Sequence, residues 1–290
     1  MFVQPEITMQ ALPLGPLVLP WGPVLVLVGY VVAALVAWLE RRDGRADAEP
    51  ALFALLLLAL LTARAVFVAR HWAAYRGVLA MLDIRDLGFA PWPGAIVALL
   101  GGALWLWRRP ALRRPLALSA ASGLVIAGLI GAIVSIAQPL RTPLPEVTLR
   151  TLDGAAQPLA ALRGTPLVLN LWATWCPPCE RELPLLVNAA RSERGVRIVL
   201  VDQGQDTVTV RDYLRAHRLD PPMVLLDGDE VLLRAYHSPG LPTTLFIAAD
   251  GRLVSAHVGE LSRATLAQAL TQLRAASMRA ASAHIPGSAF

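Results

Sequence analysis

The hydropathy of this chain is divided between two halves, and that division most constrains its fold. Nearly all the long apolar runs lie in residues 12–138, whereas residues 141–278 carry charges throughout, as ordinary soluble sequence does. The chain is 56% hydrophobic and 16% charged, with a mean hydropathy of +0.54, which is typical of a membrane protein. Its 290 residues fit about two domains. We therefore expect an α-helical membrane bundle followed by a soluble domain.

The apolar half divides into four predicted membrane spans. Each is near the ~20 residues that a helix needs to cross a bilayer. They cover residues 17–39, 51–69, 93–107 and 116–138. The third is the shortest and contains Gly101-Gly102, so a buried or re-entrant segment is the alternative for that span.

Two features of these spans predict how the helices pack. Arg64 lies inside the second span, where a charge is costly and marks a functional candidate; the alternatives are snorkelling to an interface and pairing inside the bundle. Gly123, Ala127 and Gly131 place small residues at every fourth position of the last span. Small residues at that spacing favour close helix packing, which we expect within the chain; packing between two chains in a dimer is the alternative.

Arginines in the loops predict the orientation of the spans. The net charge is +5 and the sequence contains no lysine. Arginines follow the first span and separate the third from the fourth, at Arg41, Arg42, Arg45, Arg108, Arg109, Arg113 and Arg114. Because positive loops stay in the cytoplasm, both termini and the soluble half should face the periplasm or its equivalent. This distribution explains the basic charge better than nucleic-acid binding does. Residues 1–10 lack the positive segment of a cleaved signal peptide, so the first span should remain in the mature protein.

The segment Cys176-Pro177-Pro178-Cys179 carries the clearest chemistry in the soluble half. Its two cysteines are the only ones in the sequence, and they follow an apolar run at residues 167–172 that is typical of a buried strand. Prolines are accepted at the start of a helix, and acidic residues favour its first turn. Cys176 should therefore lie at a helix N-terminus, where the pKa of a thiol falls. Cys179, one turn later, is close enough to form a disulfide with it.

This spacing favours a dithiol that cycles between its reduced and oxidised forms. A structural disulfide that closes so short a loop would constrain little chain entropy. A zinc site needs four ligands, and the sequence has no second cysteine pair. We predict Cys176 as the attacking thiolate and Cys179 as the resolving thiol. The only cofactor expected is the redox-active disulfide itself, and no metal is expected.

Two segments of the soluble half resemble a known family. Trp172-Ala-Thr-Trp-Cys-Pro-Pro-Cys-Glu-Arg-Glu-Leu-Pro184 is similar to the active-site segment of the TlpA/ResA group of membrane-anchored, thioredoxin-like thiol–disulfide oxidoreductases. Ser238-Pro-Gly-Leu-Pro-Thr-Thr-Leu-Phe-Ile247 resembles the cis-proline loop that faces the CxxC motif in that fold. The organisation expected is a transmembrane domain at residues 1–140, an α/β thioredoxin-like domain at 141–278 and a disordered, Ala/Ser-rich tail at 279–290.

The resemblance also implies a proton-transfer role for Glu182. This residue follows Cys179 by three positions and so lies on the same helix face. In the family the corresponding carboxylate is partly buried and relays protons with the cysteines. The alternative is an ordinary acidic residue of a first helical turn. Asn170 stands where thioredoxin itself has a buried Asp, and an amide cannot act as a base, so the proton role would pass to Glu182.

The second matching segment implies a surface that binds substrate. Pro242 should be cis, and a cis bond there would expose the backbone of Leu241 to pair with a substrate peptide beside Cys176. Trp175 should be exposed beside the sulfurs and contact substrate, whereas Trp172 should be packed inside the domain.

The membrane half has a resemblance of its own. Leu14-Gly-Pro-Leu-Val-Leu-Pro-Trp-Gly-Pro-Val-Leu and Thr62-Ala-Arg-Ala-Val-Phe-Val are similar to the first two spans of prolipoprotein diacylglyceryl transferase. That family carries a membrane-embedded His-Gly-Gly motif, whereas this chain has Leu100-Gly101-Gly102. Because the histidine is missing, transferase activity is not expected. The segment would instead be an anchor or a scaffold that binds lipid or a partner.

These observations predict a thiol–disulfide oxidoreductase in the bacterial inner membrane, with its redox domain in the periplasm. The resemblance implies a disulfide reductase acting on oxidised cysteines of exported proteins, apocytochrome c among the candidates; a CxxC motif alone does not fix the direction. The spans contain no cysteine, so a separate membrane donor of the DsbD/CcdA type should supply electrons. The alternatives are a bifunctional or degenerate diacylglyceryl transferase with a redox domain, and a membrane scaffold with accessory redox activity.

Overall fold

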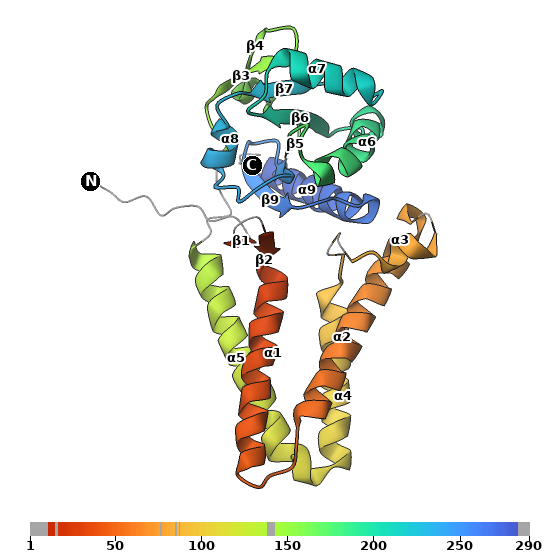
Figure 1. Cartoon of the computed structure of the whole chain (residues 1–290), viewed down its shortest axis with the longest axis vertical. Helices are drawn as coiled ribbons and strands as arrows, with labels where there is room; N and C mark the ends of the chain where they lie inside the picture. The colour runs from red at the N-terminus through yellow and green to blue at the C-terminus, as the bar shows by residue number, and fades with distance from the viewer. Residues whose placement is uncertain are drawn as a thin grey trace, which may run out of the picture. The chain divides into compact units, whose positions relative to one another are not determined.

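The protein consists of two compact units, one of them helical and the other built on a sheet (Figure 1). The structure is a computed structural model that describes residues 11–14, 17–75, 77–84, 86, 88–137 and 143–283. The helical unit lies within residues 20–136. The domain boundary predicted at residue 140 falls outside the described residues. A small two-stranded sheet of β1 (Ala11–Leu14) and β2 (Leu17–Pro20) precedes the first helix.

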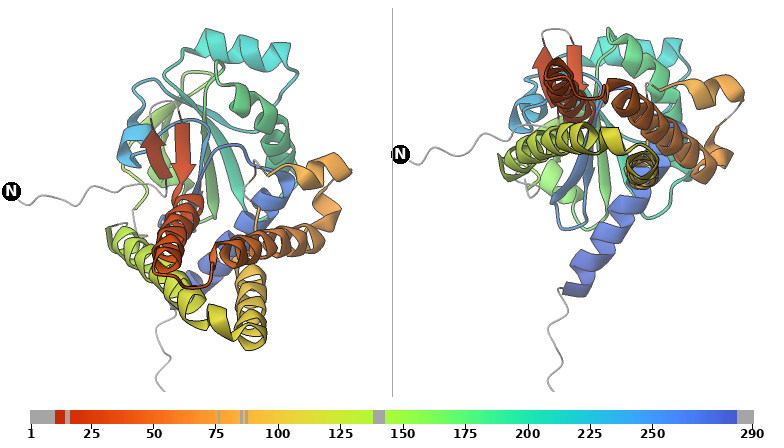
Figure 2. Two further views of the ribbon diagram at one scale, coloured as in Figure 1. Left: turned by 60° about the horizontal axis from the view of Figure 1, so that its bottom comes forward. Right: turned by 90° about the horizontal axis from the view of Figure 1, so that it is seen from below.

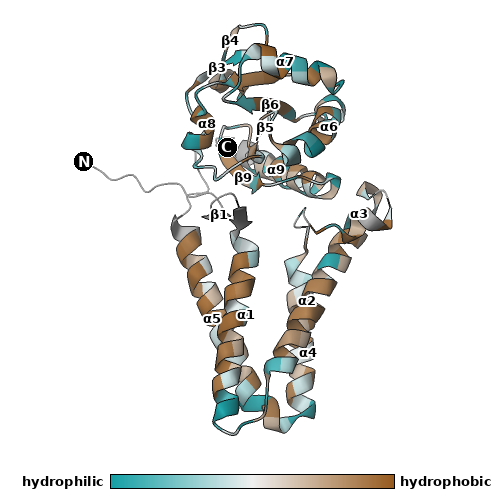
Figure 3. Ribbon diagram, viewed as in Figure 1, coloured by the Kyte–Doolittle hydropathy of each residue, from teal (hydrophilic) through white to brown (hydrophobic). Residues whose placement is uncertain are grey.

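The helical unit contains four long helices, and Figure 3 shows how apolar their residues are. They are α1 (Trp21–Arg42), α2 (Glu49–Arg70), α4 (Pro91–Arg108) and α5 (Arg113–Ala137). Shorter helical turns connect them: η1 (Trp72–Ala74), α3 (Val78–Leu82) and η2 (Pro110–Leu112). The first predicted span begins too early, because residues 17–20 form β2 and the helix starts at Trp21.

Among the described residues, three helical segments are long and apolar enough to cross a membrane. They cover residues 21–42, 49–70 and 110–134. The sequence predicted four spans, and α4 is not among these three. Its 18 residues include two prolines, three tryptophans and Arg108, which lower its mean hydropathy. The structure therefore supports a helical region with three candidate membrane spans.

Glycines allow the helices of this unit to approach closely. A Cβ atom on Gly123 of α5 would lie 2.3 Å from the carbonyl oxygen of Gly29 in α1, and one on Gly94 of α4 would lie 2.5 Å from the carbonyl oxygen of Ala59 in α2. A Cβ atom cannot lie that close to a backbone oxygen, so both positions require glycine as long as the helices keep this spacing. The small residues of the last span thus pack within the chain, as the sequence predicts.

The second unit is an α/β domain around a seven-stranded sheet, seen from two further directions in Figure 2. Its strands are β3 (Thr148–Thr151), β4 (Ala156–Pro158), β5 (Leu167–Trp172), β6 (Arg197–Gln203), β7 (Val224–Asp227), β8 (Thr243–Ile247) and β9 (Leu253–Val258). Its helices are η3 (Leu159–Leu162), α6 (Pro177–Ser192), α7 (Thr207–Ala216), α8 (Val231–Ala235) and α9 (Arg263–Ala283). The strand order is β4-β3-β7-β6-β5-β8-β9, with β5, β6 and β7 parallel.

Strand β5 occupies the interior of this sheet because its residues are buried on both faces. All six of its residues are buried, which explains why the segment reads as a continuous apolar run. Alternate side chains enter two separate cores. One contains Trp172 and residues of α6, α7 and α9, and the other contains Leu169 and residues of η3 and α8. The site of interest lies where β5 ends and α6 begins.

Helix α9 is longer than the sequence predicts. The closing helix was expected to end before a disordered tail at residue 279, but α9 continues to Ala283. Residues 279–283 are rich in alanine, which has the highest helix propensity, so the helix propagates into them. The rest of the predicted tail lies outside the described residues.

Candidate active site

The two cysteines lie at the start of α6 and are joined to each other. Cys176 is the N-cap residue of the helix, and Pro177 and Pro178 begin its first turn. Cys176 and Cys179 form a disulfide with an S–S distance of 2.10 Å and a Cα–Cα distance of 5.2 Å. The backbone N–H of Cys179 donates to Sγ of Cys176 at 3.3 Å. The sulfur of Cys176 therefore lies where the helix dipole and a backbone N–H stabilise negative charge, as the sequence predicts.

Both cysteines are buried in this disulfide form. Cys176 is 3% exposed and Cys179 is fully buried. Trp175, by contrast, is 66% exposed, whereas Trp172 packs inside the domain; both agree with the sequence prediction. Trp175 is thus the large side chain that this loop presents to the outside.

The peptide bond between Leu241 and Pro242 is cis, as predicted. Strand β8 begins at the next residue and pairs antiparallel with β5, so that Thr243 lies opposite Leu171. This register places the cis-proline loop beside the end of β5, from which the chain leads to the cysteines. The loop is braced by Thr243, whose Oγ1 donates to the carbonyl oxygen of Gly240 at 2.7 Å.

Glu182 is buried one turn beyond Cys179 on α6. Its carboxyl group is 1% exposed and accepts two hydrogen bonds, from Asn170 Nδ2 at 2.7 Å and from the backbone N–H of Leu261 at 2.9 Å. Burial raises the pKa of Glu182 to about 7, although both of these hydrogen bonds lower it. A solvated first-turn glutamate would not have this environment, so Glu182 differs in kind from its neighbour Glu180, which is exposed.

Asn170 connects three elements around Glu182. Its Nδ2 also donates to Thr244 Oγ1 of β8 at 2.9 Å, so it joins β5 to both α6 and β8. The sequence identified neither Thr244 nor Leu261 as a partner in this network. A polar residue inside an apolar run was the only signal available, and it does not identify partners that are distant in sequence.

A second buried carboxyl group lies on β6, the parallel neighbour of β5. Asp202 is fully buried near the end of β6, where it pairs in register with Trp172. Burial raises its pKa to about 7, and the nearby Asp206 and Asp227 raise it further, while a hydrogen bond from the backbone of Gln205 lowers it. Sequence reasoning did not identify Asp202, because its burial follows from the pairing of strands and not from any local pattern.

Arg64 of α2 is held within the helical unit by five hydrogen bonds. Its guanidinium group donates to Asp86 Oδ1 at 2.9 Å and to the carbonyl oxygens of Met81, Asp83 and Gly88. Asp86 is 7% exposed. These contacts match the third role considered for Arg64 in the sequence, which is pairing inside the helical unit. The arginine joins α2 to the connection that leads to α4.

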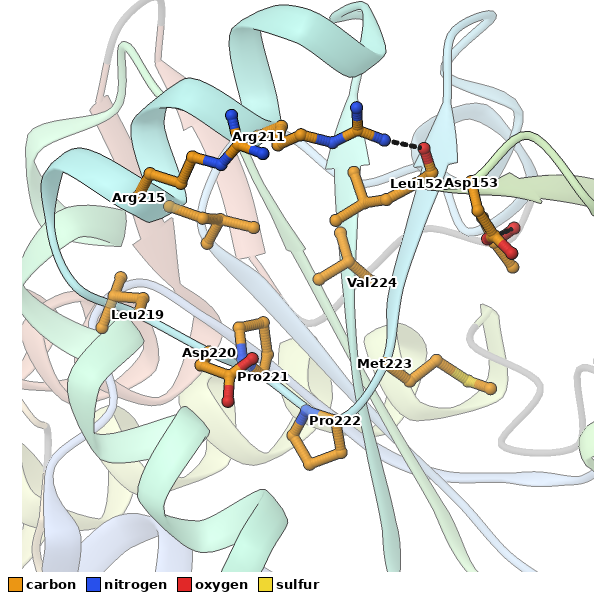
Figure 4. Close-up of a pocket in the computed structure, with 12 residues that line it drawn as sticks. Leu152, Asp153, Arg211, Arg215, Leu219, Asp220, Pro221, Pro222, Met223 and Val224 are labelled. Carbon is orange, nitrogen blue, oxygen red and sulfur yellow. Dashed lines mark hydrogen bonds between the residues drawn. The ribbon is translucent and has the colours of Figure 1, made fainter.

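The chain also contains an open pocket away from the cysteines (Figure 4). It lies where α7 ends and β7 begins, and none of the residues placed in the cysteine site lines it. Arg211 crosses it and donates to the carbonyl oxygen of Leu152 at 2.6 Å. Within the described part of the chain, no group of three or more His, Cys, Asp or Glu could hold a metal ion.

Comparison with known proteins gives this site a family. Residues 140–273 match the Redoxin family. The ResA thiol–disulfide oxidoreductase of Bacillus subtilis is 32% identical over 124 residues, which cover 42% of this chain and 69% of that protein. The ResA of Bacillus anthracis is 31% identical over 42% of this chain and 71% of its own. Among solved structures, a secreted Mycobacterium tuberculosis disulfide oxidoreductase aligns at 29% identity over 43% of this chain and 95% of its own, with a TM-score of 0.39. Through its C-terminal unit, this chain belongs to the ResA family of thiol–disulfide oxidoreductases and exchanges thiols and disulfides with cysteine-containing proteins.

Proposed function

We propose that the protein is a membrane-anchored disulfide reductase of exported proteins, with Cys176 and Cys179 as its reactive pair. The observation that carries this proposal is the position of Cys176 as the N-cap of α6, where its sulfur accepts the N–H of Cys179. A thiol at this position forms a thiolate readily. Oxidised cysteines of a substrate protein supply the disulfide that it attacks.

The reaction proceeds through a mixed disulfide. The Cys176 thiolate attacks one sulfur of the substrate disulfide, and the other substrate sulfur leaves as a thiolate. The Cys179 thiol then loses its proton and attacks Sγ of Cys176, which closes the Cys176–Cys179 disulfide and releases the second substrate thiolate. Two electrons pass from the protein to the substrate, and the substrate thiolates take up two protons.

Glu182 is the group that we assign to the proton from Cys179. It lies one helical turn further along α6, and a pKa raised to about 7 by burial allows its carboxyl group to take up and release a proton near neutral pH. Trp175 and the backbone of Leu241 would hold an extended substrate segment beside Cys176. Apocytochrome c is one candidate among the exported substrates.

The helical unit would anchor this site in the inner membrane and place it in the periplasm. Arg45 and Arg114 both contact Glu40, at 2.7 Å and 4.0 Å, so the α1–α2 and α4–α5 connections lie at the same end of the unit. Both connections carry arginines, which supports a cytoplasmic position for that end. With α4 as a fourth membrane helix, residues 20 and 137 lie on the opposite side, and the redox unit follows there.

We further propose that the diacylglyceryl transferase-like segment has no transferase activity. A Cβ on Gly101 would lie 3.0 Å from Leu55 of α2, so the helix face at the degenerate motif packs against an apolar side chain. The helical unit would then serve as an anchor and as a docking element for the electron donor. Both cysteines of the sequence lie in the redox unit, so a membrane protein of the DsbD/CcdA type would reduce them again.

Trapping the substrate tests this function. Cys179→Ser in the full-length protein should accumulate mixed disulfides with exported proteins, because the resolving attack is lost while Cys176 still reacts. The partners can be released with reductant and identified by mass spectrometry. Cys176→Ser, which keeps Cys179, is the matched control and should trap far less, because the attacking sulfur is missing. Equal trapping by Cys176→Ser would exclude Cys176 as the nucleophile, and a catch without periplasmic proteins would exclude the proposed substrates.

A further inference from the structure

The loop between β5 and α6 is held by one glutamine from outside it. Gln205 uses both ends of its side-chain amide on Thr174: Oε1 accepts from the backbone N–H at 2.7 Å, and Nε2 donates to Oγ1 at 2.7 Å. Thr174 stands two residues before Cys176. The loop is closed further by the N–H of Cys176, which donates to the carbonyl oxygen of Ala173 at 3.3 Å. Two short bonds thus fix the residue immediately before Trp175.

Gln205 is itself fixed by the buried carboxyl group of Asp202. The backbone N–H of Gln205 donates to Asp202 Oδ1 at 3.1 Å. The intervening Gly204 has a φ of +80°, a conformation that favours glycine, and its N–H donates to the carbonyl oxygen of Asp227. Asp202 is anchored in turn by β6, where it lies beside Trp172 of β5. A continuous path therefore runs from the end of β6 through Gln205 to the cysteine loop.

The arrangement around Asp202 is unusual for a residue that only stabilises the fold. Its Oδ2 atom is buried, and the described residues offer it no hydrogen-bond partner. The neighbouring carboxylates are each occupied elsewhere. Asp206 caps α7 through the N–H groups of residues 208 and 209, and Asp227 accepts from those of residues 231 and 232. Burying a half-satisfied carboxyl group is unfavourable, and such groups cluster where function requires them.

We propose that Gln205, held by Asp202, is a positioning residue that sets the geometry of Trp175 and Cys176 for thiol–disulfide exchange. Neither Gln205 nor Asp202 touches the reacting sulfurs. Gln205 acts through Thr174, and Asp202 acts through Gln205. This positioning role rests on the proposed role of Cys176 as the nucleophile. It means that the cysteine loop is supported from a second direction, in addition to α6. Glu182 lies one turn beyond Cys179 on α6, whereas Gln205 braces the loop from the segment that follows β6.

The test compares four variants of the full-length protein in exchange with a disulfide-bonded protein substrate. Gln205→Ala and Asp202→Ala should each lower kcat about tenfold with little change in KM, the loss expected when one or two hydrogen bonds that position the loop are removed. Asp202→Asn keeps an acceptor oxygen at the Oδ1 position and should restore kcat to within about twofold. Asp206→Asn removes a charge from the same turn without touching Thr174, and it should behave as the wild type.

Three further measurements separate positioning from folding and from the proposed function. Thr174→Val removes one of the two bonds but keeps the backbone one, so it should lower kcat about threefold even if Gln205→Ala fails to fold. The thermal midpoint reports folding for every variant. Cys176→Ser measured in parallel tests the nucleophile: full activity there would overturn the proposed function. If Cys176→Ser is inactive while folded Gln205→Ala and Thr174→Val keep the wild-type kcat, the positioning role alone is refuted. Loss of activity in Asp202→Asn equal to that in Asp202→Ala would also refute it.

Discussion

Replacing Glu182 by glutamine should change how the stability of the redox unit depends on pH. The carboxyl group is 1% exposed, and burial raises its pKa from an ordinary value of 4.5 to about 7. At about 1.36 kcal/mol for each pKa unit, this difference corresponds to about 3 kcal/mol. Asn170 Oδ1 has no partner among the described residues, so the Asn170 amide can turn to accept a hydrogen bond from the introduced glutamine amide, and the variant can fold.

The sign of the effect follows from the proton balance. Because the pKa of Glu182 is higher in the folded state, the folded protein binds more protons than the unfolded chain between about pH 4.5 and 7. The free energy of unfolding of the wild type therefore falls as pH rises through this window. Glu182→Gln cannot ionise, so it lacks this fall, and its stability relative to the wild type should rise by about 3 kcal/mol between about pH 4.5 and 8.

Urea unfolding of the fragment 143–283 at a series of pH values measures this difference. Both core clusters of the sheet lie within that fragment, so we expect it to fold on its own. Asp202, whose pKa is also raised by burial, contributes a similar pH dependence in both proteins, so subtracting one stability profile from the other removes its contribution. Glu180→Gln is the matched control, because Glu180 is exposed on the same helix and should leave the profile unchanged. A difference between Glu182→Gln and the wild type that stays constant across this pH range would refute the reasoning.

Two other predictions concern the helical unit. Arg64→Leu should lower the thermal midpoint in detergent and expose the α2–α4 connection to protease, because it leaves Asp86 buried without its ion-pair partner at a cost of about 3 kcal/mol. Arg70→Leu, at the exposed end of the same helix, should do neither, and equal midpoints for the two variants would contradict the pairing. Full-length protein in vesicles, supplied with thioredoxin and reductant on its cytoplasmic side, should keep Cys176 and Cys179 oxidised until a membrane electron donor is added. Thiol alkylation reports the redox state of the two cysteines. Their reduction in sealed vesicles without the donor would show that the chain conducts electrons itself.

The parts of the site that could be predicted are those encoded within a short segment. The N-cap position of Cys176 follows from the prolines and acidic residues beside it, and the cis bond at Pro242 follows from a motif of neighbouring residues. The braces of Glu182 and Thr174 could not be predicted, because they join residues 79 and 31 positions apart. Only the order of strands in the sheet brings such pairs together.

The membrane half shows the same limit. Apolar runs predicted the four long helices, but not that three helical segments of the described chain would be long and apolar enough to cross a membrane, with α4 outside that set. The pattern around Arg64 likewise left several roles open. Its partner Asp86 lies 22 residues away, in a segment with no regular periodicity. Hydropathy reports where a helix can lie, whereas ion pairs between segments depend on the folded bundle.

The burial of the oxidised cysteine pair makes the protein selective about when it equilibrates with its surroundings. With Cys176 only 3% exposed and Cys179 fully covered, a small thiol in solution finds almost no sulfur surface to attack. The rate of thiol exchange depends on access to the sulfur, whereas the reduction potential sets only the equilibrium. If Trp175 is the docking surface proposed above, a donor or substrate protein that binds there would open that access, which a diffusing thiol would not. The pair is in this sense kinetically insulated: its oxidation state would follow the proteins that it meets and not the thiol pool around it.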